Sequence, residues 1–432
     1  MRRTRAAYHY AVRRVKSEKQ NIVMQRFADS IIGNRYRDFW SEVRKINGKS
    51  HALANVVEGI SDAQGIANMF ASKFQNLYNS VSYDRVKMDD IKRELSNDIA
   101  ARGQEHIVQI YAEDVCDAVN KMKYNKNDGS NDLSTNHLKF AGYDLFWHLS
   151  LLLSSIITHG SLPNDFLQGT TIPIPKGCNA NLTCADNYRG ITLGSIFGRV
   201  LDLIILFRYE DHLSTSDLQF GFKRHRSTNM CTMLLKEVIS YCTSNNSSLY
   251  CVFLDATKAF DKVEYCSLFR ELMNRDIPPL IVRVLLNIYT GQQIRVLWNG
   301  AYSNSFSVSN GVKQGAILSP LLFCVYYDNL LLALRSKGVG CHVGEFFLGA
   351  LAYADDVVLL APSANAMRQM LLTCDAYSAE FNLSFNAAKS KCLFFRSRNM
   401  RRCSFSPGVP FVVGGKDIEF VNKWSHLGHI IG

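Results

Sequence analysis

Three aspartates occupy positions where a carboxylate is unfavourable unless it binds a cation. Asp255 directly follows the apolar run 249–254, and Asp355 and Asp356 stand side by side between two further apolar runs. Buried carboxylates that lie next to each other repel one another and lose their hydration. A pair of divalent cations would relieve both costs, and nucleotidyl transfer uses such a pair, about 4 Å apart, to activate a 3′-oxygen and hold a triphosphate. Taken alone, each acidic segment is also explained as a solvated turn.

Regular elements must hold these aspartates in place. Residues 249–254 have the length and composition of a buried strand, and a helix is expected over 262–274 with Asp261 capping its first turn. The segment FFLGALAYADDVVLLAPS is typical of a hairpin whose tip carries the two adjacent acids. Between these segments, the pattern predicts a helix from about Ile317 to Leu334.

The pattern of apolar residues changes near Pro163. Residues 1–100 are polar with helical periodicity, and residues 112–161 are again helical apart from the turn-rich string NKNDGSND. After Pro163, short β-like runs alternate with helical segments. With 432 residues, 47% of them hydrophobic, the chain is long enough for two or three domains. We therefore expect an α+β domain preceded by a helical, basic extension.

The net charge of +11 is concentrated at the N-terminus. Residues 1–50 carry 13 basic and 4 acidic side chains, a balance of 13 − 4 = +9. Such an arm suits a polyanion, either nucleic acid or an anionic membrane surface, but a solvated helix surface explains it equally well.

The cysteines and the hydropathy pattern predict the compartment. The 12 cysteines are scattered and form no CxxC pair, so a zinc site has little support, and Cys178 and Cys184 are expected to be free thiols. The pattern favours a reducing, intracellular compartment. No signal peptide is recognised. The longest apolar stretch, 145–157, is broken by His and Ser residues and is too short and too polar to span a bilayer, so no membrane-spanning segment is expected and a membrane is not among the expected partners.

The aspartate segments together resemble the conserved motifs of reverse transcriptases. YADD, with a strand that ends in D-x4-F-D, resembles motifs C and A, and SNGVKQGAILSPLLFCVYYDNLL between them resembles motif B, with Gln314 and Gly315 before its helix. The resemblance implies a right-hand polymerase with an antiparallel palm sheet. It also implies that Asp255, Asp355 and Asp356 bind two Mg²⁺ ions, with Mn²⁺ as the alternative.

Further segments resemble substrate-binding parts of the same family. TTIPIPKG and DNYRGITL resemble the fingers, where Lys176 and Arg189 match the basic residues that hold the incoming triphosphate; a lone lysine there is also explained as a surface turn residue. LSFNAAKSKCLFF resembles motif D, which makes Lys389 the candidate proton donor to pyrophosphate. In motif A, Phe260 matches the aromatic ring that excludes a ribose 2′-OH, so the product is expected to be DNA; ordinary core packing is the alternative.

Two segments resemble parts of the family that contact nucleic acid. QFGFKRHRST resembles the template-contacting segment, where Arg224 and Arg226 are candidates for phosphate contacts, although an exposed basic loop has the same composition. WSHLGHIIG resembles motif E, the primer grip, with Leu427–Gly428 at its turn.

Four segments upstream of motif A, namely RDFWSEVRKING, IANMFASKFQNLY, KYNKNDGSNDLSTNHLKFAG and GSLPNDFLQGTTIPIPKG, resemble non-LTR, LINE-type (jockey-like) elements rather than retroviral enzymes. This resemblance implies a helical basic extension over 1–105 and a reverse transcriptase domain over 106–432, with fingers and lead-in at 106–245 and the palm at 246–432. The implied partners are an RNA template, a DNA primer and dNTPs; the expected location is the nucleus, with the cytoplasm as the alternative. A thumb is expected to be absent. One rival is a catalytically weak, truncated relic that binds nucleic acid; another is an intron-encoded maturase or a telomerase-like enzyme. The oligomeric state is left open.

Overall fold

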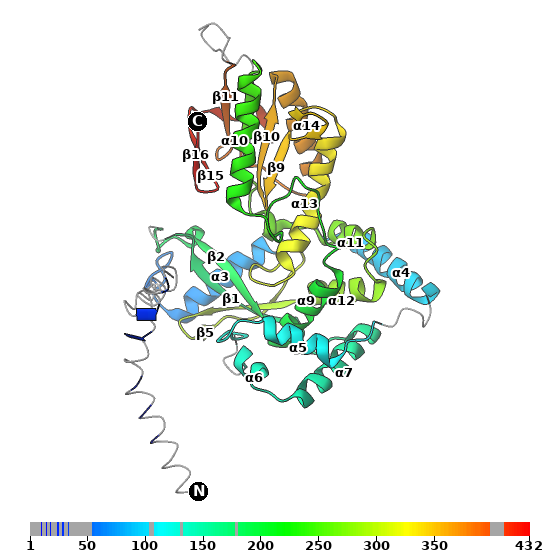
Figure 1. Ribbon diagram of the computed structural model, residues 1–432. Coiled ribbons are helices and arrows are strands. Elements are labelled where there is room, and N and C mark those ends of the chain that lie inside the picture. Colours follow the sequence, from blue (N-terminus) through cyan, green and yellow to red (C-terminus); the bar gives the residue numbers. More distant parts are fainter. Residues whose placement is uncertain are drawn as a thin grey trace. The chain divides into compact units, whose positions relative to one another are not determined.

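The computed structural model describes residues 54–102, 108–129, 133–177, 180–397 and 410–432, together with isolated positions before residue 34. The chain divides into two compact units, Met1–Val57 and Glu58–Gly432. Most of the basic segment 1–50 lies outside the described residues. The second unit contains the sheets (Figure 1) and, by sequence, the three aspartates.

The helices and strands of the second unit alternate along the chain. The α-helices are α3 (Ala63–Leu77), α4 (Arg85–Arg102), α5 (Ala112–Lys121), α6 (Thr135–Lys139), α7 (Tyr143–His159), α8 (Asn164–Leu167), α9 (Ile196–Tyr209), α10 (Thr228–Ser244), α11 (Tyr265–Met273), α12 (Pro279–Thr290), α13 (Ser319–Ser336) and α14 (Ala364–Glu380). The 3-10 helices are η2 (Ala185–Asn187) and η3 (Ala259–Lys262). The strands are β1 (Gln168–Pro175), β2 (Tyr188–Gly194), β3 (Leu249–Leu254), β4 (Gln293–Trp298), β5 (Ala301–Tyr302), β6 (Phe306–Ser307), β7 (His342–Val343), β8 (Phe346–Phe347), β9 (Ala350–Tyr353), β10 (Asp356–Ala361), β11 (Lys391–Phe395), β12 (Val412–Val413), β13 (Lys416–Asp417), β14 (Glu419–Phe420), β15 (Trp424–His426) and β16 (His429–Ile431).

The first sheet has the order β2-β1-β4-β5, with β6 also paired to β4. β1 runs antiparallel to β2 and parallel to β4. Helix α3 packs on this sheet through Phe70, whose ring centroid lies 5.1 Å from that of Tyr188 and 5.2 Å from that of Trp298. These aromatic contacts bury the helix face that carries the periodic apolar residues.

The second sheet has the order β14-β11-β3-β10-β9, and its central strands are antiparallel. Alternate residues of a strand face opposite sides of a sheet, and both sides are covered here. Val252 and Leu254 of β3 belong to the core beneath α11, α13 and α14, whereas Cys251 and Phe253 belong to a separate core with residues of α10. Burial on both faces explains why β3 is continuously apolar rather than alternating.

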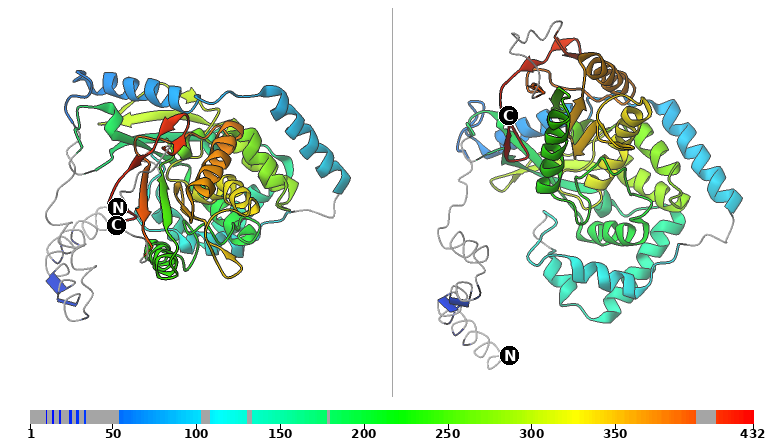
Figure 2. Two further views of the ribbon diagram at one scale, coloured as in Figure 1. Left: turned by 90° about the horizontal axis from the view of Figure 1, so that it is seen from above. Right: turned by 45° about the horizontal axis from the view of Figure 1, so that its top comes forward.

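Helices α4, α12, α7, α5 and α9 pack against one another in that order (Figures 1 and 2). Helix α4 packs against α11 and α12, and α5 packs against α7 and α9. Asp114 of α5 accepts two hydrogen bonds from the Arg208 guanidinium of α9, at 3.3 and 2.6 Å. This forked pair fixes the relative orientation of the two helices.

The mixed α+β architecture expected from the sequence is confirmed. β3 ends at Leu254 as expected, and the acidic hairpin has its tip between β9 and β10. The expectation that Asp261 caps a helix is wrong. The turn η3 intervenes, α11 starts later at Tyr265, and the side chain of Glu264 accepts hydrogen bonds from Cys266 N at 2.8 Å and Ser267 N at 2.7 Å.

The ten cysteines that the structure describes, Cys184 included, are free thiols; Cys178 lies outside the described residues. Among the described helices, none combines the length and apolarity needed to cross a membrane.

Glu264 is predicted to stabilise the start of α11, because its side chain accepts hydrogen bonds from the backbone N–H groups of Cys266 and Ser267. Replacing Glu264 by Ala removes the acceptor for two backbone N–H groups and should lower the free energy of unfolding by about 1–2 kcal/mol. Glu271→Ala on the same helix is the matched control and should change it by less than about 0.5 kcal/mol. Urea unfolding measures both; equal effects would contradict the capping role.

Candidate active site

The three aspartates come from adjacent strands of the second sheet. Asp255 follows the last residue of β3, Asp355 lies in the turn between β9 and β10, and Asp356 is the first residue of β10. β10 pairs antiparallel with β3, so that Val357 lies opposite Leu254. Because the two strands are antiparallel, the C-terminal end of β3 lies beside the N-terminal end of β10 and the β9–β10 turn (Figure 1).

The electrostatics of these acids reflect their closeness. Burial, followed by repulsion from Asp355 and Asp255, raises the pKa of Asp356 to about 6. Burial also raises the pKa of Asp355, and the charge of Asp255 acts in the same direction, whereas Arg189 opposes it. The ionised forms are therefore unfavourable until a positive charge joins them.

Lys389 lies on the open side of Asp255. Its ammonium Nζ is 4.0 Å from Asp255 Oδ2, and its side chain is 69% exposed. A pocket of about 320 Å³ is lined by Asp255, Asp356, Lys389 and the hairpin residues 424–427. The lysine is thus positioned to reach a group bound beside the acids.

The β15–β16 hairpin forms the other wall of this pocket. Leu427 and Gly428 make its two-residue turn with φ of 48° and 81°, and His429 Nε2 lies 3.0 Å from Asn229 Oδ1 of α10. His426 is buried, its ring centroid lies 5.0 Å from that of Phe253, and burial lowers its pKa to about 4. The hairpin therefore presents its turn, not a charged imidazole, beside the acids.

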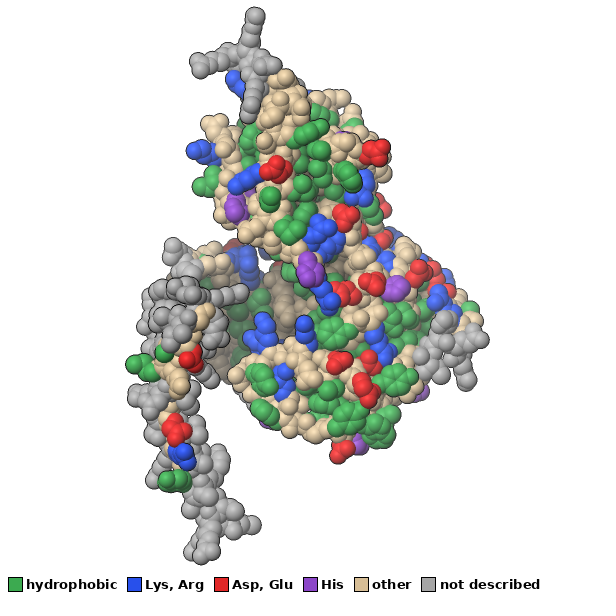
Figure 3. All heavy atoms as spheres, in the orientation of Figure 1, with side chains coloured by type: hydrophobic (Ala, Val, Ile, Leu, Met, Phe, Trp, Pro, Cys, Tyr) green, Lys and Arg blue, Asp and Glu red, His purple; other side chains and the backbone are tan. Residues whose placement is uncertain are grey.

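A group of cations gathers near the β1–β2 hairpin. Lys176 follows β1 and donates to the carbonyl of Asp186 at 2.6 Å. Burial lowers its pKa, and repulsion from Lys258, Arg189 and Lys73 adds to that shift. Mutual repulsion among these cations favours an anion at this place. Figure 3 shows Lys and Arg side chains bordering a hollow in one face of the molecule.

Gln314 and Gly315 form a turn that rests on β2. Thr192 N donates to Gln314 O at 2.9 Å, and Gly315 has φ 110°. A Cβ at Gly315 would lie 3.1 Å from Ile191 Cγ2 and 3.3 Å from Thr192 O, so a side chain there would be both strained and crowded. This turn joins the first sheet to α13.

Asp261 is a site residue whose role the sequence did not reveal. It is 6% exposed, and its Oδ1 accepts a hydrogen bond from Gln314 Nε2 at 2.7 Å. Burial raises its pKa to about 6, opposed by the Gln314 hydrogen bond and by Lys258, Lys176 and Arg189. The D-x4-F-D spacing signalled a motif, but only the fold shows that its second acid holds Gln314.

Phe260 is half-buried beside this pair. Its ring stacks on Phe323 of α13, with centroids 4.2 Å apart and planes 16° apart, and the ring of Phe222 meets it at 6.3 Å edge to face. Val312 N donates to its carbonyl at 2.8 Å. The ring is therefore held from several sides while part of its surface stays open.

Arg224 and Arg226 lie in a different pocket, of about 480 Å³, next to Gly221 and Phe222. Both are in ion pairs, Arg224 with Glu210 at 2.9 Å and Arg226 with Asp217 at 3.2 Å. The expected phosphate contacts would have to compete with these acids.

The residues around the acids fit divalent cations in their chemistry. Carboxylate oxygens are the donors that Mg²⁺ and Mn²⁺ prefer, and like-charge repulsion among Asp255, Asp355 and Asp356 is what such an ion relieves. Within the described residues, no group of three His, Cys, Asp or Glu side chains is drawn together tightly enough to hold a metal ion as it stands.

Comparisons with known proteins show the family to which this chain belongs. Residues 174–431, more than half of the chain, match the family model "Reverse transcriptase (RNA-dependent DNA polymerase)". The chain is 28% identical over 280 residues to the Retrovirus-related Pol polyprotein from type-2 retrotransposable element R2DM of Drosophila melanogaster, covering 64% of this chain and 26% of that protein.

It is also 24% identical over 330 residues to the RNA-directed DNA polymerase from mobile element jockey of Drosophila funebris, covering 74% of this chain and 35% of the relative. The chain thus spans about a quarter to a third of the length of these relatives. The matched region contains every element that carries the three aspartates, and the chain belongs to the reverse transcriptase (RNA-dependent DNA polymerase) family, with its relatives among non-LTR retrotransposons.

Proposed function

We propose that this chain is the polymerase part of a non-LTR retrotransposon protein, which adds dNTPs to a DNA primer on an RNA template. The observation that supports the proposal is that Asp255 lies close to Asp355 and Asp356, at the neighbouring ends of β3 and β10, in a chain of the reverse transcriptase family. On this proposal the second sheet is the palm, and the β1–β2 hairpin belongs to the fingers.

Asp255, Asp355 and Asp356 would hold two Mg²⁺ ions, with Mn²⁺ as a substitute. Bound there, the ions would lower the pKa of the primer 3′-hydroxyl and neutralise the triphosphate. The protein's own contribution is to place the carboxylates before substrate arrives, because β3 and β10 are paired and buried on both faces. The loss of their mutual repulsion on ion binding then favours the loaded site.

The cations beyond the acids suit the triphosphate. Lys176 and Arg189 would bind its oxygens, because their charges repel one another in the unliganded protein. Lys389, 4.0 Å from Asp255, would donate a proton to the departing pyrophosphate. Gln314, held by Asp261, and Gly315 would contact the sugar and base of the nucleotide.

The nucleic-acid contacts follow the same layout. The Leu427–Gly428 turn would hold the primer end next to the acids, and Arg224 and Arg226 would meet template phosphates after leaving their ion pairs. The division into a basic extension over 1–105 and a polymerase domain over 106–432, with fingers to 245 and palm from 246, is part of this proposal. We also propose that the protein acts in the nucleus.

Removal of one acid is predicted to stop the chemistry. Asp255→Asn and Asp355→Asn should each lower the rate of dNTP addition on an RNA template by about 10²-fold or more, because the reacting oxygen loses its position. Asp165→Asn, an exposed aspartate of α8, is the control and should keep the parental rate. Parental rates in both site variants would refute the metal assignment. A parent that binds RNA but adds no dNTP would favour the truncated relic.

Phe260 is predicted to exclude ribonucleotides. Phe260→Val should open space for a 2′-hydroxyl and raise rNTP incorporation relative to dNTP by roughly 10²-fold, because a steric clash is removed. Phe269→Leu is the control, since Phe269 is a fully buried core phenylalanine that makes its ring contacts with Tyr265 and Tyr289 and not beside the acids. Competition between dNTP and rNTP measures the ratio; the same ratio in parent and Phe260→Val would leave Phe260 as core packing only.

The basic arm is predicted to bind RNA through phosphates. Deletion of residues 1–50, which carry +9 of the net charge, should flatten the plot of log affinity against log salt concentration, since fewer counterions are released. Fluorescence anisotropy with RNAs of unrelated sequence measures the slope. An unchanged slope would assign the arm to a solvated helix surface.

A further inference from the structure

The turn that carries the acids has a backbone conformation that alanine disfavours. Ala354 has φ 57°, in the left-handed region where its Cβ crowds the following carbonyl. Glycine reaches this region without that cost. Because Ala354 directly precedes Asp355 and Asp356, its conformation decides where the two carboxylates lie. A contact from outside the turn is therefore needed to keep it in place.

Gln219 makes that contact. Its side chain is 0% exposed, its Oε1 accepts hydrogen bonds from Ala354 N at 2.9 Å and Gly221 N at 2.8 Å, and its Nε2 donates to Ala354 O at 3.2 Å. One planar amide thus satisfies both the donor and the acceptor of the residue that the turn removes from strand pairing.

The backbone around Gln219 is docked on the same strand. Phe220 N donates to Ala352 O at 2.7 Å, and Ala352 N donates to Leu218 O at 2.8 Å. Gly221 allows this approach, because a Cβ there would lie only 2.4 Å from Ala354 N. The segment 218–221 therefore lies against β9 and the acidic turn with no room for a larger residue.

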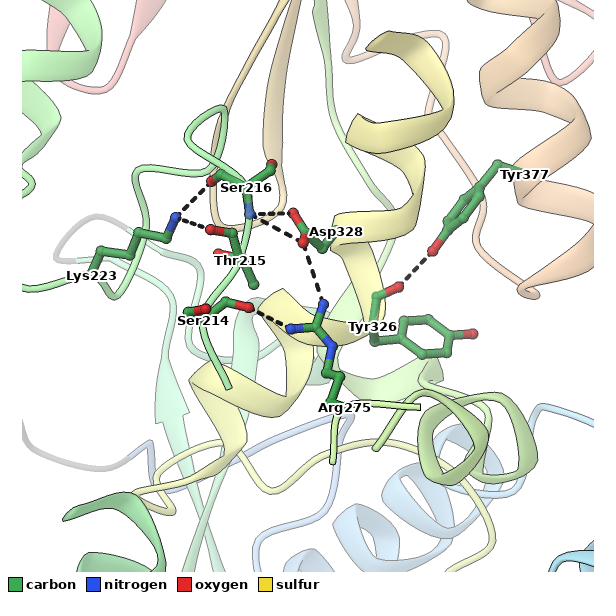
Figure 4. A network of polar contacts seen from close by, with 8 residues as sticks. All are labelled: Ser214, Thr215, Ser216, Lys223, Arg275, Tyr326, Asp328 and Tyr377. Atoms are coloured by element: carbon green, nitrogen blue, oxygen red, sulfur yellow. Dashed lines mark hydrogen bonds and ion pairs between the residues drawn. The ribbon is translucent and has the colours of Figure 1, made fainter. Parts of the chain in front are cut away.

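A buried charge network anchors the chain just before this segment (Figure 4). The carboxylate of Asp328, 3% exposed on α13, accepts hydrogen bonds from Ser216 N at 2.9 and 3.1 Å and from Arg275 at 3.3 Å. Lys223 donates to the carbonyls of Thr215 and Ser216, at 2.6 Å each. Gln219 is thus held between an anchored loop on one side and the acidic turn on the other.

We infer that Gln219 is a positioning residue for the metal-binding acids: it keeps Ala354 in the left-handed conformation and thereby sets Asp355 and Asp356 toward the ions. The inference rests on the proposed function, since it takes these acids as metal ligands. Gln219 itself touches neither metal nor substrate. Its effect must therefore appear in metal affinity and must depend on the residue at position 354.

The test is a titration of the 432-residue chain with Mn²⁺ alone, followed by electron paramagnetic resonance of the free ion. Gln219→Met keeps the length of the side chain but removes both hydrogen-bonding groups, and should weaken Mn²⁺ binding on the order of ten-fold. Asp355→Asn reports whether the ion binds at the acids. Gln292→Met is the matched control, because Gln292 is also buried, at 1% exposed, and precedes β4 in the first sheet.

A compensating variant separates positioning from packing. Ala354→Gly removes the backbone cost that Gln219 offsets. The loss caused by Gln219→Met should therefore shrink to less than about three-fold when it is measured in a chain that already carries Ala354→Gly. Thermal unfolding of each variant checks the fold. Gln219→Asn, which keeps the amide but draws it back by one methylene, is measured in the same way in case Gln219→Met does not fold.

Each outcome decides. The inference is supported if Gln219→Met and Asp355→Asn bind Mn²⁺ more weakly, Gln292→Met binds it as the parent does, and Ala354→Gly compensates for Gln219→Met. Parental binding in Gln219→Met with weaker binding in Asp355→Asn overturns the role of Gln219 and leaves the metal site standing. An equal loss with Ala or Gly at position 354 also overturns it. Parental binding in Asp355→Asn overturns the proposed metal site, and the role of Gln219 with it.

Discussion

The site depends on one constraint: three carboxylates repel one another where β3 ends and β10 begins in the second sheet. Asp255 and the Asp355–Asp356 pair stand at the ends of strands whose own residues are buried on both faces. The sheet cannot shift to separate them without unpairing β3 from β10. Burial, with repulsion from the neighbouring acids added to it, raises the pKa of Asp356 to about 6 and also raises that of Asp355. The fold holds these acids in an arrangement that is unfavourable without a counter-charge, and a bound divalent cation would relieve it.

The neighbouring elements complement that arrangement. Cations gather on the β1–β2 hairpin and at Lys258, where they repel one another as the acids do. Asp261 accepts a hydrogen bond from Gln314, and the nearby cations favour its ionised form. A nucleotide with two bound metal ions would carry charges that match both groups at once. On this proposal, substrate binding would reduce both the repulsion among the acids and the repulsion among the cations, without requiring the side chains to rearrange.

The sequence predicted the parts of this site that depend on local pattern. The sequence predicts the strand at 249–254 and the YADD hairpin correctly, because buried strands are recognisable as short apolar runs. The predicted cap of α11 is wrong because aspartate is a preferred N-cap residue and glutamate is not, and the sequence pattern did not reveal the turn η3 that separates Asp261 from α11. The contacts of Gln219 with Ala354 and of Asp261 with Gln314 join residues 135 and 53 positions apart. No local pattern encodes such contacts, because they arise from how the loops dock on the sheet.

The most direct test is anomalous diffraction from crystals of the protein soaked with Mn²⁺ and a dNTP. We expect two manganese peaks about 4 Å apart, beside the ends of β3 and β10 that carry the acids. One should lie between Asp255 and Asp355, and the triphosphate should reach toward Lys176 and Arg189. Manganese peaks only at other places, with the three aspartates making no metal contact, would contradict it.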